Sequence, residues 1–235
     1  KVIPKLGINT KIEAAKIVKD LKGAEYEVIN IEKKEVRRNP LPPFTTSALQ
    51  QESWKRFRFP AKFTMRIAQQ LYERGFITYH RTDSLNLSDL SLELAKKFIA
   101  KQYGQNYYQF RKYKTKSKTA QEAHEAIRPA YPEKTPESLK LDSNQFKLYD
   151  LIWRRFIASQ MAQAVFDATT IDIRAKNYTF RATGQILKFD GFLKVYPIKF
   201  QETELPPLEK NEILKLIRLI PSQLFTQPPP RYIEA

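Results

Sequence analysis

The chain has 235 residues, of which 42% are hydrophobic and 28% are charged, so it is long and apolar enough to bury two modest cores. Its 41 Lys and Arg outnumber its 25 Asp and Glu, and the net charge of +16 indicates a polyanionic partner. With no cysteine and two histidines, the sequence excludes thiol catalysis, disulfide bonds and the usual zinc sites.

The sequence favours neither a membrane nor export. No apolar run approaches the roughly 20 residues that cross a bilayer, and the first residues lack the basic, apolar and small-residue pattern of a signal peptide. We therefore expect a cytoplasmic protein without a membrane partner.

The first 39 residues predict a helix followed by a strand. Thr10 and Glu13 have the spacing of a capping box, and apolar residues recur at helical intervals, so we expect a helix over 10–22. Residues 25–36 are rich in β-branched and aromatic types, which favours a strand. The prolines at 40, 42 and 43 interrupt both kinds of structure and mark a domain boundary.

The rest of the chain predicts a helical block and then a β-rich end. We expect a mixed α and β fold, in which a mainly helical domain, 40–164, is inserted into a β-rich domain made of 1–39 and 165–235. Helices are expected at 46–57, 61–74, 88–103, 119–128 and 144–162, and strands at 168–174, 178–189, 192–199 and 212–220.

Tyr79 and Arg81 stand two residues apart in a segment that follows Gly75, where a helix is expected to end. In an extended segment, side chains two apart project to the same side. A guanidinium favours a phenolate and also holds phosphate through its fork of donors, so the pair suits attack by tyrosine on a phosphodiester. A buried tyrosine covered by an arginine would have the same spacing, and this alternative stays open.

His124 and Arg128 lie four residues apart and would share one face of the helix expected over 119–128. Both side chains can bind a phosphate. A surface helix with ordinary charge pairs explains the same pattern. A single histidine without a second ligand at zinc spacing is not a metal signature.

Aromatic and basic residues alternate between 107 and 118 without an acidic residue. Rings can stack on unpaired bases while cations follow the phosphate backbone. Arg111, Lys112 and Lys114 are therefore candidate DNA contacts. A basic surface loop without a ligand would have the same composition.

Two motifs are missing from the sequence. There is no G-x-x-x-x-G-K-[ST] phosphate loop, so chemistry driven by ATP is not expected in this chain. There is also no tight cluster of Asp residues suited to Mg²⁺. A metal-dependent step would need residues from outside the chain.

Three phrases of the sequence occur in a characteristic order and at characteristic separations: PFTTSALQQE at 43–52, AQQLYERGFITYHRTDS at 68–84 and QEAHEAIRP at 121–129. Together they closely resemble bacterial DNA topoisomerase I, of the type IA class. Shorter likenesses at 148–156, 189–192 and 226–232 extend the resemblance over nearly the whole chain.

The resemblance implies a role for each residue of the site. Tyr79 matches the nucleophile that joins to a 5′ phosphate of one DNA strand, Arg81 matches the arginine beside it, and His124 matches a histidine that contacts DNA in the active-site cleft. The residue after the tyrosine is usually Met or Pro in this family, whereas this chain has His80. A second imidazole near the phosphate can alter the pH dependence.

The resemblance also implies that the chain is a fragment, similar to the β-rich arch and the helical lid of the family, domains II and III. The acidic toprim domain would precede it, so no cofactor is expected here and Mg²⁺ is expected in the intact enzyme. That enzyme would relax negative supercoils in the bacterial nucleoid without ATP, by cleaving one strand, passing the other and resealing. The isolated chain would not relax DNA.

Three other protein classes share parts of this pattern. A non-catalytic module that binds single-stranded nucleic acid is the main alternative. Tyrosine recombinases and type IB topoisomerases place H-x-x-R before a C-terminal tyrosine, which this sequence does not. Reverse gyrase carries a related module and stays open as the parent protein.

Overall fold

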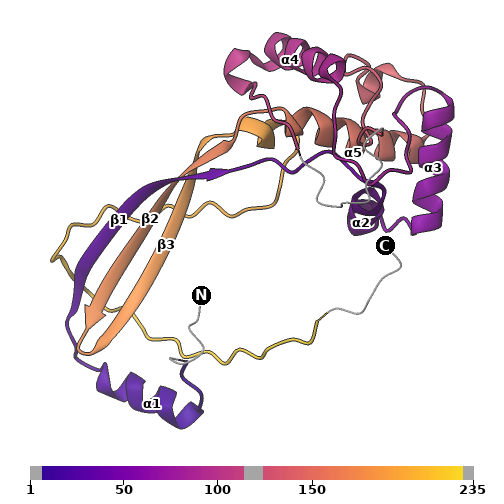
Figure 1. Cartoon of the computed structure of the whole chain (residues 1–235). Coiled ribbons are helices and arrows are strands. Elements are labelled where there is room, and N and C mark those ends of the chain that lie inside the picture. Colours follow the sequence, from indigo (N-terminus) through magenta and orange to yellow (C-terminus); the bar gives the residue numbers. More distant parts are fainter. Residues whose placement is uncertain (1–6, 114–123, 230–235) are drawn as a thin grey trace. The chain divides into compact units, whose positions relative to one another are not determined.

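The computed structural model describes residues 7–113 and 124–229, which form two compact units (Figure 1). Among the described residues, the sheet unit takes 7–36, 166–187 and 201–229, and the helical unit takes 37–113, 124–165 and 188–200. The mixed α and β fold class is confirmed, whereas the arch with an inserted domain and its boundaries stay predictions. None of the described helices is long and apolar enough to span a membrane.

The sheet unit is built on a four-stranded sheet in the order β3-β2-β1-β4. Its strands are β1 (Tyr26–Arg38), β2 (Ala164–Ala175), β3 (Tyr178–Phe189) and β4 (Ile213–Leu214). A two-residue turn that starts at Lys176, with a positive φ of 51°, joins β2 to β3. β4 pairs antiparallel with the start of β1, so the last described part of the chain returns to this sheet.

Helix α1 (Lys11–Asp20) packs at one end of this sheet. Thr10 caps it, because its hydroxyl accepts a hydrogen bond from the backbone N–H of Glu13 at 3.1 Å. The carboxylate of Glu13 accepts from the N–H of Asn9, one residue before Thr10, so only the Thr10 half of the predicted capping box is formed as expected. Leu21 then enters a small core with Tyr26 and with apolar residues of β2 and β4.

The helical unit is organised around α5 (Ser143–Ser159), which is buried on most of its surface. Helices α2 (Thr46–Phe57) and α3 (Ala61–Glu73) pack against α5, and α4 (Asp89–Tyr103) leads into a short 3-10 helix, Gln105–Tyr107. Asp142 caps α5 by accepting from the N–H groups of Asn144 and Gln145. The predicted helices at 46–57, 61–74, 88–103 and 144–162 are thus confirmed to within three residues.

The helix expected over 119–128 is wrong for its described part. Residues 124–130 run without helix, and Ile127 forms a bridge to Phe44 while Pro129 forms one to Ile77. The backbone N–H of Ile127 donates to the carbonyl of Phe44 at 2.8 Å. These partners are distant in the sequence and satisfy backbone groups that a helix would have paired locally. Residues 119–123 lie outside the described residues.

Two expected strands are also corrected. Residues 192–199 contain a 3-10 turn, Gly191–Lys194, rather than a strand. Gly191 has a φ of 49°, and a Cβ there would lie 2.3 Å from the carbonyl oxygen of Gln163, so the backbone bends where only glycine fits. In the segment 212–220 only Ile213–Leu214 pairs as a strand, and Ile217 is 93% exposed.

Candidate active site

The segment that carries Tyr79 begins where α3 ends. Gly75 takes the left-handed conformation with a φ of 68°, and the N–H of Phe76 donates to the carbonyl of Leu71 at 2.9 Å. This glycine terminus turns the chain sharply away from the helix axis. Ile77 then pairs with Pro129, so the chain continues in an extended form toward Tyr79.

Side chains alternate between exposed and buried along the segment after Ile77. Tyr79, Arg81 and Asp83 are exposed, whereas His80 and its alternate neighbours Thr82 and Ser84 are buried. This is the alternation of an extended chain with one face on the protein. Tyr79 is 38% exposed, so the open alternative of a fully buried tyrosine does not describe this structure, and Tyr79 and Arg81 share the solvent side.

Two hydrogen-bonded contacts hold this segment, and the first involves Thr78. Its hydroxyl donates to the carbonyl of Ala126 at 2.7 Å and accepts from the N–H of Arg128 at 3.0 Å. Its own N–H donates to the carbonyl of Arg128 at 2.9 Å. Thr78 therefore ties the residue before Tyr79 to the segment that carries His124.

The second contact involves Thr46, the first residue of α2. Its N–H donates to the carbonyl of Thr82 at 2.8 Å, and its hydroxyl accepts from the N–H of Thr82 at 2.9 Å. The same hydroxyl donates to the carbonyl of His80 at 2.8 Å. The backbone on both sides of Arg81 is thereby attached to the start of a helix. No signal in the sequence marked Thr46 as part of the site, although it lies in the phrase at 43–52.

His124 lies against Tyr79, with 5.6 Å between the ring centroids. The ring of Tyr72, from α3, also lies next to the ring of Tyr79, with 5.4 Å between the two centroids. The structure thus brings His124 and Tyr79 together although the segment of His124 is extended rather than helical. The reason is the pairing by Thr78, which does not depend on a helix.

His80 lies on the buried face of the segment, and its side chain is fully buried. Neither ring nitrogen has a hydrogen-bond partner among the described residues. Burial, with a smaller contribution from the nearby charge of Arg81, lowers the pKa of His80. A neutral imidazole therefore packs beneath Tyr79, where the ring centroids are 5.4 Å apart.

The basic residues proposed as DNA contacts are engaged within the protein to different extents. Arg128 forms an ion pair with Glu125 at 2.6 Å, and its side chain is 11% exposed. Arg111 donates to the carbonyl of Met161 and to Gln109. Lys112 is exposed and lies 3.2 Å from Asp89. Lys114 lies outside the described residues.

The aromatic residues of the stretch from 107 also have internal partners. The hydroxyl of Tyr107 donates to Asp190 at 2.7 Å, and burial together with this hydrogen bond raises the pKa of Tyr107 to about 12. The hydroxyl of Tyr113 donates to the carbonyl of Ser159 at 2.9 Å. Phe110, at 54% exposure, is the ring of this stretch most open to solvent among those described.

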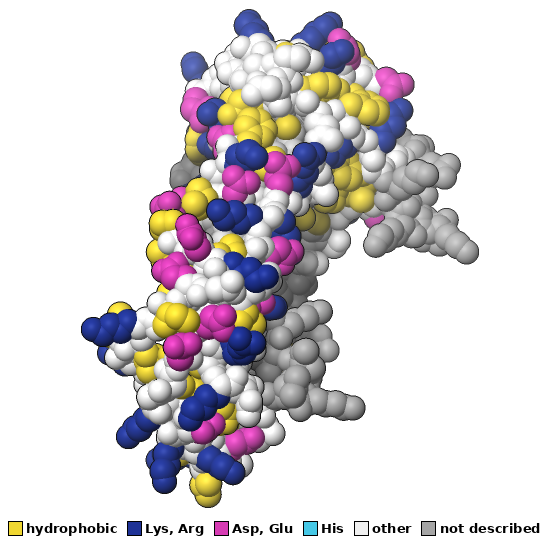
Figure 2. Space-filling view, turned by 90° about the vertical axis from the view of Figure 1, so that its left-hand side faces the viewer, with side chains coloured by type: hydrophobic (Ala, Val, Ile, Leu, Met, Phe, Trp, Pro, Cys, Tyr) yellow, Lys and Arg dark blue, Asp and Glu magenta, His cyan; other side chains and the backbone are white. Residues whose placement is uncertain are grey.

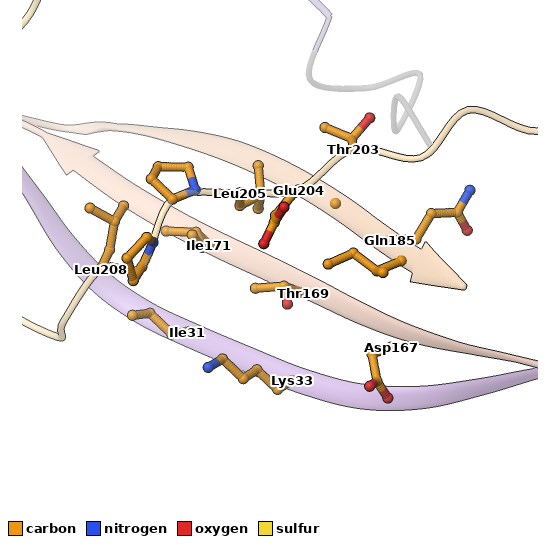
Figure 3. Close-up of a pocket in the computed structure, with 14 residues that line it drawn as sticks. Ile31, Lys33, Asp167, Thr169, Ile171, Gln185, Thr203, Glu204, Leu205 and Leu208 are labelled. Atoms are coloured by element: carbon orange, nitrogen blue, oxygen red, sulfur yellow. The ribbon is translucent and has the colours of Figure 1, made fainter. Parts of the chain in front are cut away.

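A separate cavity of about 330 Å³ lies in the sheet unit, between β1, β2 and β3 and the segment 203–208 (Figure 3). The segment approaches closely at Gly184, where a Cβ would lie 2.5 Å from the carbonyl oxygen of Thr203. None of the predicted site residues lines this cavity. Among the described residues, no group of three or more His, Asp or Glu is placed to hold a metal ion, and we assign no residue of this chain to Mg²⁺.

Comparison with known proteins identifies the class. The family model for DNA topoisomerase matches residues 3–235. Full-length topoisomerase I from Thermotoga maritima is 37% identical, with a TM-score of 0.74, and the match covers 86% of this chain and 34% of that one. The chain belongs to the bacterial type IA DNA topoisomerase family and spans about a third of the length of the Thermotoga protein.

Proposed function

We propose that Tyr79 is the nucleophile of a type IA DNA topoisomerase and cleaves one DNA strand transiently. The observation that carries the proposal is the exposed Tyr79 ring in contact with His124, on a segment that also presents Arg81 to solvent. The family match supports it, because topoisomerases act on the DNA backbone. The substrate would be a single-stranded region of DNA.

In the proposed step, the phenolic oxygen of Tyr79 attacks a backbone phosphorus. A bond forms between this oxygen and the 5′ phosphate, and the bond from phosphorus to the 3′ oxygen breaks. The phenol loses its proton and the departing 3′ oxygen gains one, so the strand ends in a 3′ hydroxyl. Attack by this hydroxyl on the phosphotyrosine reverses the step without ATP, because one phosphodiester replaces another.

Arg81 and His124 would act on the reacting phosphate. A guanidinium neutralises the phosphate and orients it through two parallel hydrogen bonds. The imidazole of His124, beside the Tyr79 ring, is in position to contact the phosphate or the phenolic proton. Among the described residues neither Arg81 nor His124 pairs with a carboxylate, which leaves both available to DNA.

The remaining residues proposed to contact DNA differ in whether their side chains are already bonded within the protein. Lys112 stays a proposed contact because it is exposed, and Lys114 stays a sequence-based proposal. Arg111 and Arg128 are better explained as residues that position backbone, since their guanidinium groups are occupied. The alternative of a purely binding module rests on the net charge of +16 and on this stretch. It is weakened on the second point, because two of the three tyrosines of the stretch, Tyr107 and Tyr113, are anchored internally.

The test is covalent capture of DNA by the chain in the context of a full-length topoisomerase I. A single-stranded oligonucleotide labelled at its 3′ end should become attached to the protein and survive denaturation, and Tyr79→Phe should remove the labelled band. Undiminished capture by Tyr79→Phe would contradict the proposal.

We also propose that strand passage and Mg²⁺ binding require the rest of the enzyme, so the 235-residue chain alone should not relax a supercoiled plasmid.

A further inference from the structure

The junction of α2 and α3 carries a second surface of alternating aromatic and basic residues, 54–66, which we call the ridge. It contains five Lys and Arg and no Asp or Glu. All five cations are exposed and all four rings are half-buried. The cations are Lys55, Arg56, Arg58, Lys62 and Arg66, and the rings are Trp54, Phe57, Phe59 and Phe63.

Three of the four rings of the ridge are in contact in series. Phe57 and Phe59 lie 5.3 Å apart by ring centroid, and Phe59 meets Phe63 edge to face at 5.0 Å. The guanidinium of Arg66 stands 5.0 Å from the ring of Phe63, and that of Arg58 stands 5.8 Å from the ring of Trp54. The three phenylalanine rings and Arg66 therefore form one connected cluster, and Trp54 and Arg58 form a second contact next to it in the sequence.

The local backbone explains why this surface faces solvent. Arg58 ends α2 in the left-handed conformation with a φ of 60°, and Pro60 precedes the first turn of α3. Lys62 and Arg66 are one turn apart on the exposed side of α3, whereas Ile67 lies on its buried side. The turn thus places cations from both sides of the junction beside rings of the ridge, Arg58 at Trp54 and Arg66 at Phe63.

Four of the five cations are not neutralised by the protein. Arg56 pairs with Glu52 at 2.6 Å and stacks on Tyr196 at 4.4 Å, so its charge is used internally. The other four have no carboxylate partner among the residues that the structure describes. This differs from the face of the molecule in Figure 2, where Lys and Arg are interspersed with Asp and Glu.

We propose that the ridge is a binding surface for single-stranded DNA, distinct from the residues around Tyr79. The four cations without a carboxylate partner suit a polyanion, and aromatic rings that reach solvent can stack on unpaired bases, whose faces are covered in a duplex. The ridge has none of the internal hydroxyl bonds that anchor Tyr107 and Tyr113, because its rings are Phe and Trp. Binding there requires no strand cleavage, so this proposal stands or falls independently of the function proposed for Tyr79.

The charge test uses the 235-residue chain and an oligo(dT) of about 12 nucleotides, within the usual size of single-strand sites. The triple variant Arg58→Gln, Lys62→Gln, Arg66→Gln should weaken binding by about tenfold or more at moderate salt. It should also reduce the slope of log Kd against log salt by about 2, since each lost phosphate contact removes about 0.7.

The matched control removes three charges elsewhere in the same unit, by Lys96→Gln, Lys101→Gln and Lys147→Gln, which are exposed and have no carboxylate partner among the described residues. This control should keep most of the affinity. Equal losses in the two triple variants would show a non-specific charge effect and overturn the proposal, as would unchanged binding by the ridge variant. Circular dichroism and thermal unfolding of both variants exclude loss of fold as the cause.

A second readout reports on stacking. The chain has two tryptophans, Trp54 in the ridge and Trp153, which is 5% exposed and donates to the carbonyl of Pro132. Oligo(dT) should quench the fluorescence of the Tyr79→Phe chain as fully as that of the wild type, and the Trp54→Leu variant should lose this quenching. An equal response to a blunt duplex of the same length, or quenching that survives Trp54→Leu, would contradict the proposal for single strands.

Discussion

Two regions of the helical unit place a tyrosine next to an arginine, and the structure uses them in opposite ways. Tyr79 is 38% exposed, and no hydrogen-bond partner for its hydroxyl is found in the described part of the chain. Tyr107 and Tyr113, in the stretch around Arg111, donate their hydroxyls to Asp190 and to the carbonyl of Ser159. The first region presents its polar groups to solvent, and the second uses them to hold the unit together.

The difference shows that residue composition does not separate a reactive tyrosine from a structural one. A buried hydroxyl must find an acceptor, and the acceptors of Tyr107 and Tyr113 are 83 and 46 residues away in the chain. At Tyr79 the hydrogen bonds are made by its neighbours Thr78 and Thr82, which hold the backbone and leave the phenol free. Four predictions test this contrast.

The largest effect is expected from removing the Tyr79 hydroxyl. Tyr79→Phe should abolish covalent capture of DNA in the full-length context, whereas Tyr113→Phe should retain it, because only the first hydroxyl is free to attack. The measurement is transfer of a 3′-labelled strand to protein on a denaturing gel. Loss of capture in both variants at equal stability would remove the contrast between the two regions.

The next effect concerns the attachment of the segment by Thr46. Thr46→Val keeps the side-chain shape but leaves the N–H of Thr82 without its acceptor and the carbonyl of His80 without its donor. We expect cleavage to slow by about 10- to 100-fold, because a displaced Tyr79 and Arg81 no longer meet the phosphate correctly. Single-turnover cleavage and DNA affinity, measured separately, should show a loss in rate with little change in Kd.

Thr46→Ser is the matched control, since it retains the hydroxyl. It should recover most of the cleavage rate. If the Ser and Val variants are equally slow, the methyl group rather than the hydrogen bonds holds the segment, and the positioning role of Thr46 is wrong.

A smaller effect is expected in the anchored region. Tyr107→Phe removes a hydrogen bond to a carboxylate and should lower the free energy of unfolding by about 1.5 kcal/mol, with DNA capture unaffected at temperatures where the protein is folded. Denaturant unfolding measures this change. A Tyr107→Phe variant as stable as the wild type would show that the hydrogen bond to Asp190 contributes nothing to stability.

The smallest effect is a dependence of stability on pH through His80. Its pKa is lowered in the folded protein, where Arg81, Glu73, Tyr72 and Tyr79 surround it. Below about pH 6.5 the imidazole therefore binds a proton in the unfolded chain more readily than in the folded chain. The free energy of unfolding consequently falls as the pH falls, by at most about 1.4 kcal/mol per pH unit.

The measurement compares the wild type with His80→Met between pH 5 and 8. The variant should lose part of the decline below pH 6.5, since Met does not titrate. Parallel profiles in the two proteins would show that the imidazole of His80 is protonated as readily in the folded state as in the unfolded one.

Local signals in the sequence determined most of the elements. Thr45, Pro60 and Gly75 mark the ends of α2 and α3, and helices at 46–57 and 61–74 were predicted within a residue of their observed bounds. The shared solvent side of Tyr79 and Arg81 followed from the two-residue repeat of an extended chain. These features are readable because caps, glycine termini and side-chain periodicity act over a few residues.

Tertiary structure alone decided which of these elements meet. A helix was predicted over 119–128, yet the described residues 124–130 pair with Phe44 and Ile77 because those distant backbone groups need partners. The same pairing sets His124 beside Tyr79, and the contact of Thr46 with Thr82 spans 36 residues. A sequence specifies local conformational preferences strongly. Whether the backbone groups of a segment pair within a helix or with a distant segment depends on which segments pack beside it, and this is fixed only when the whole unit folds.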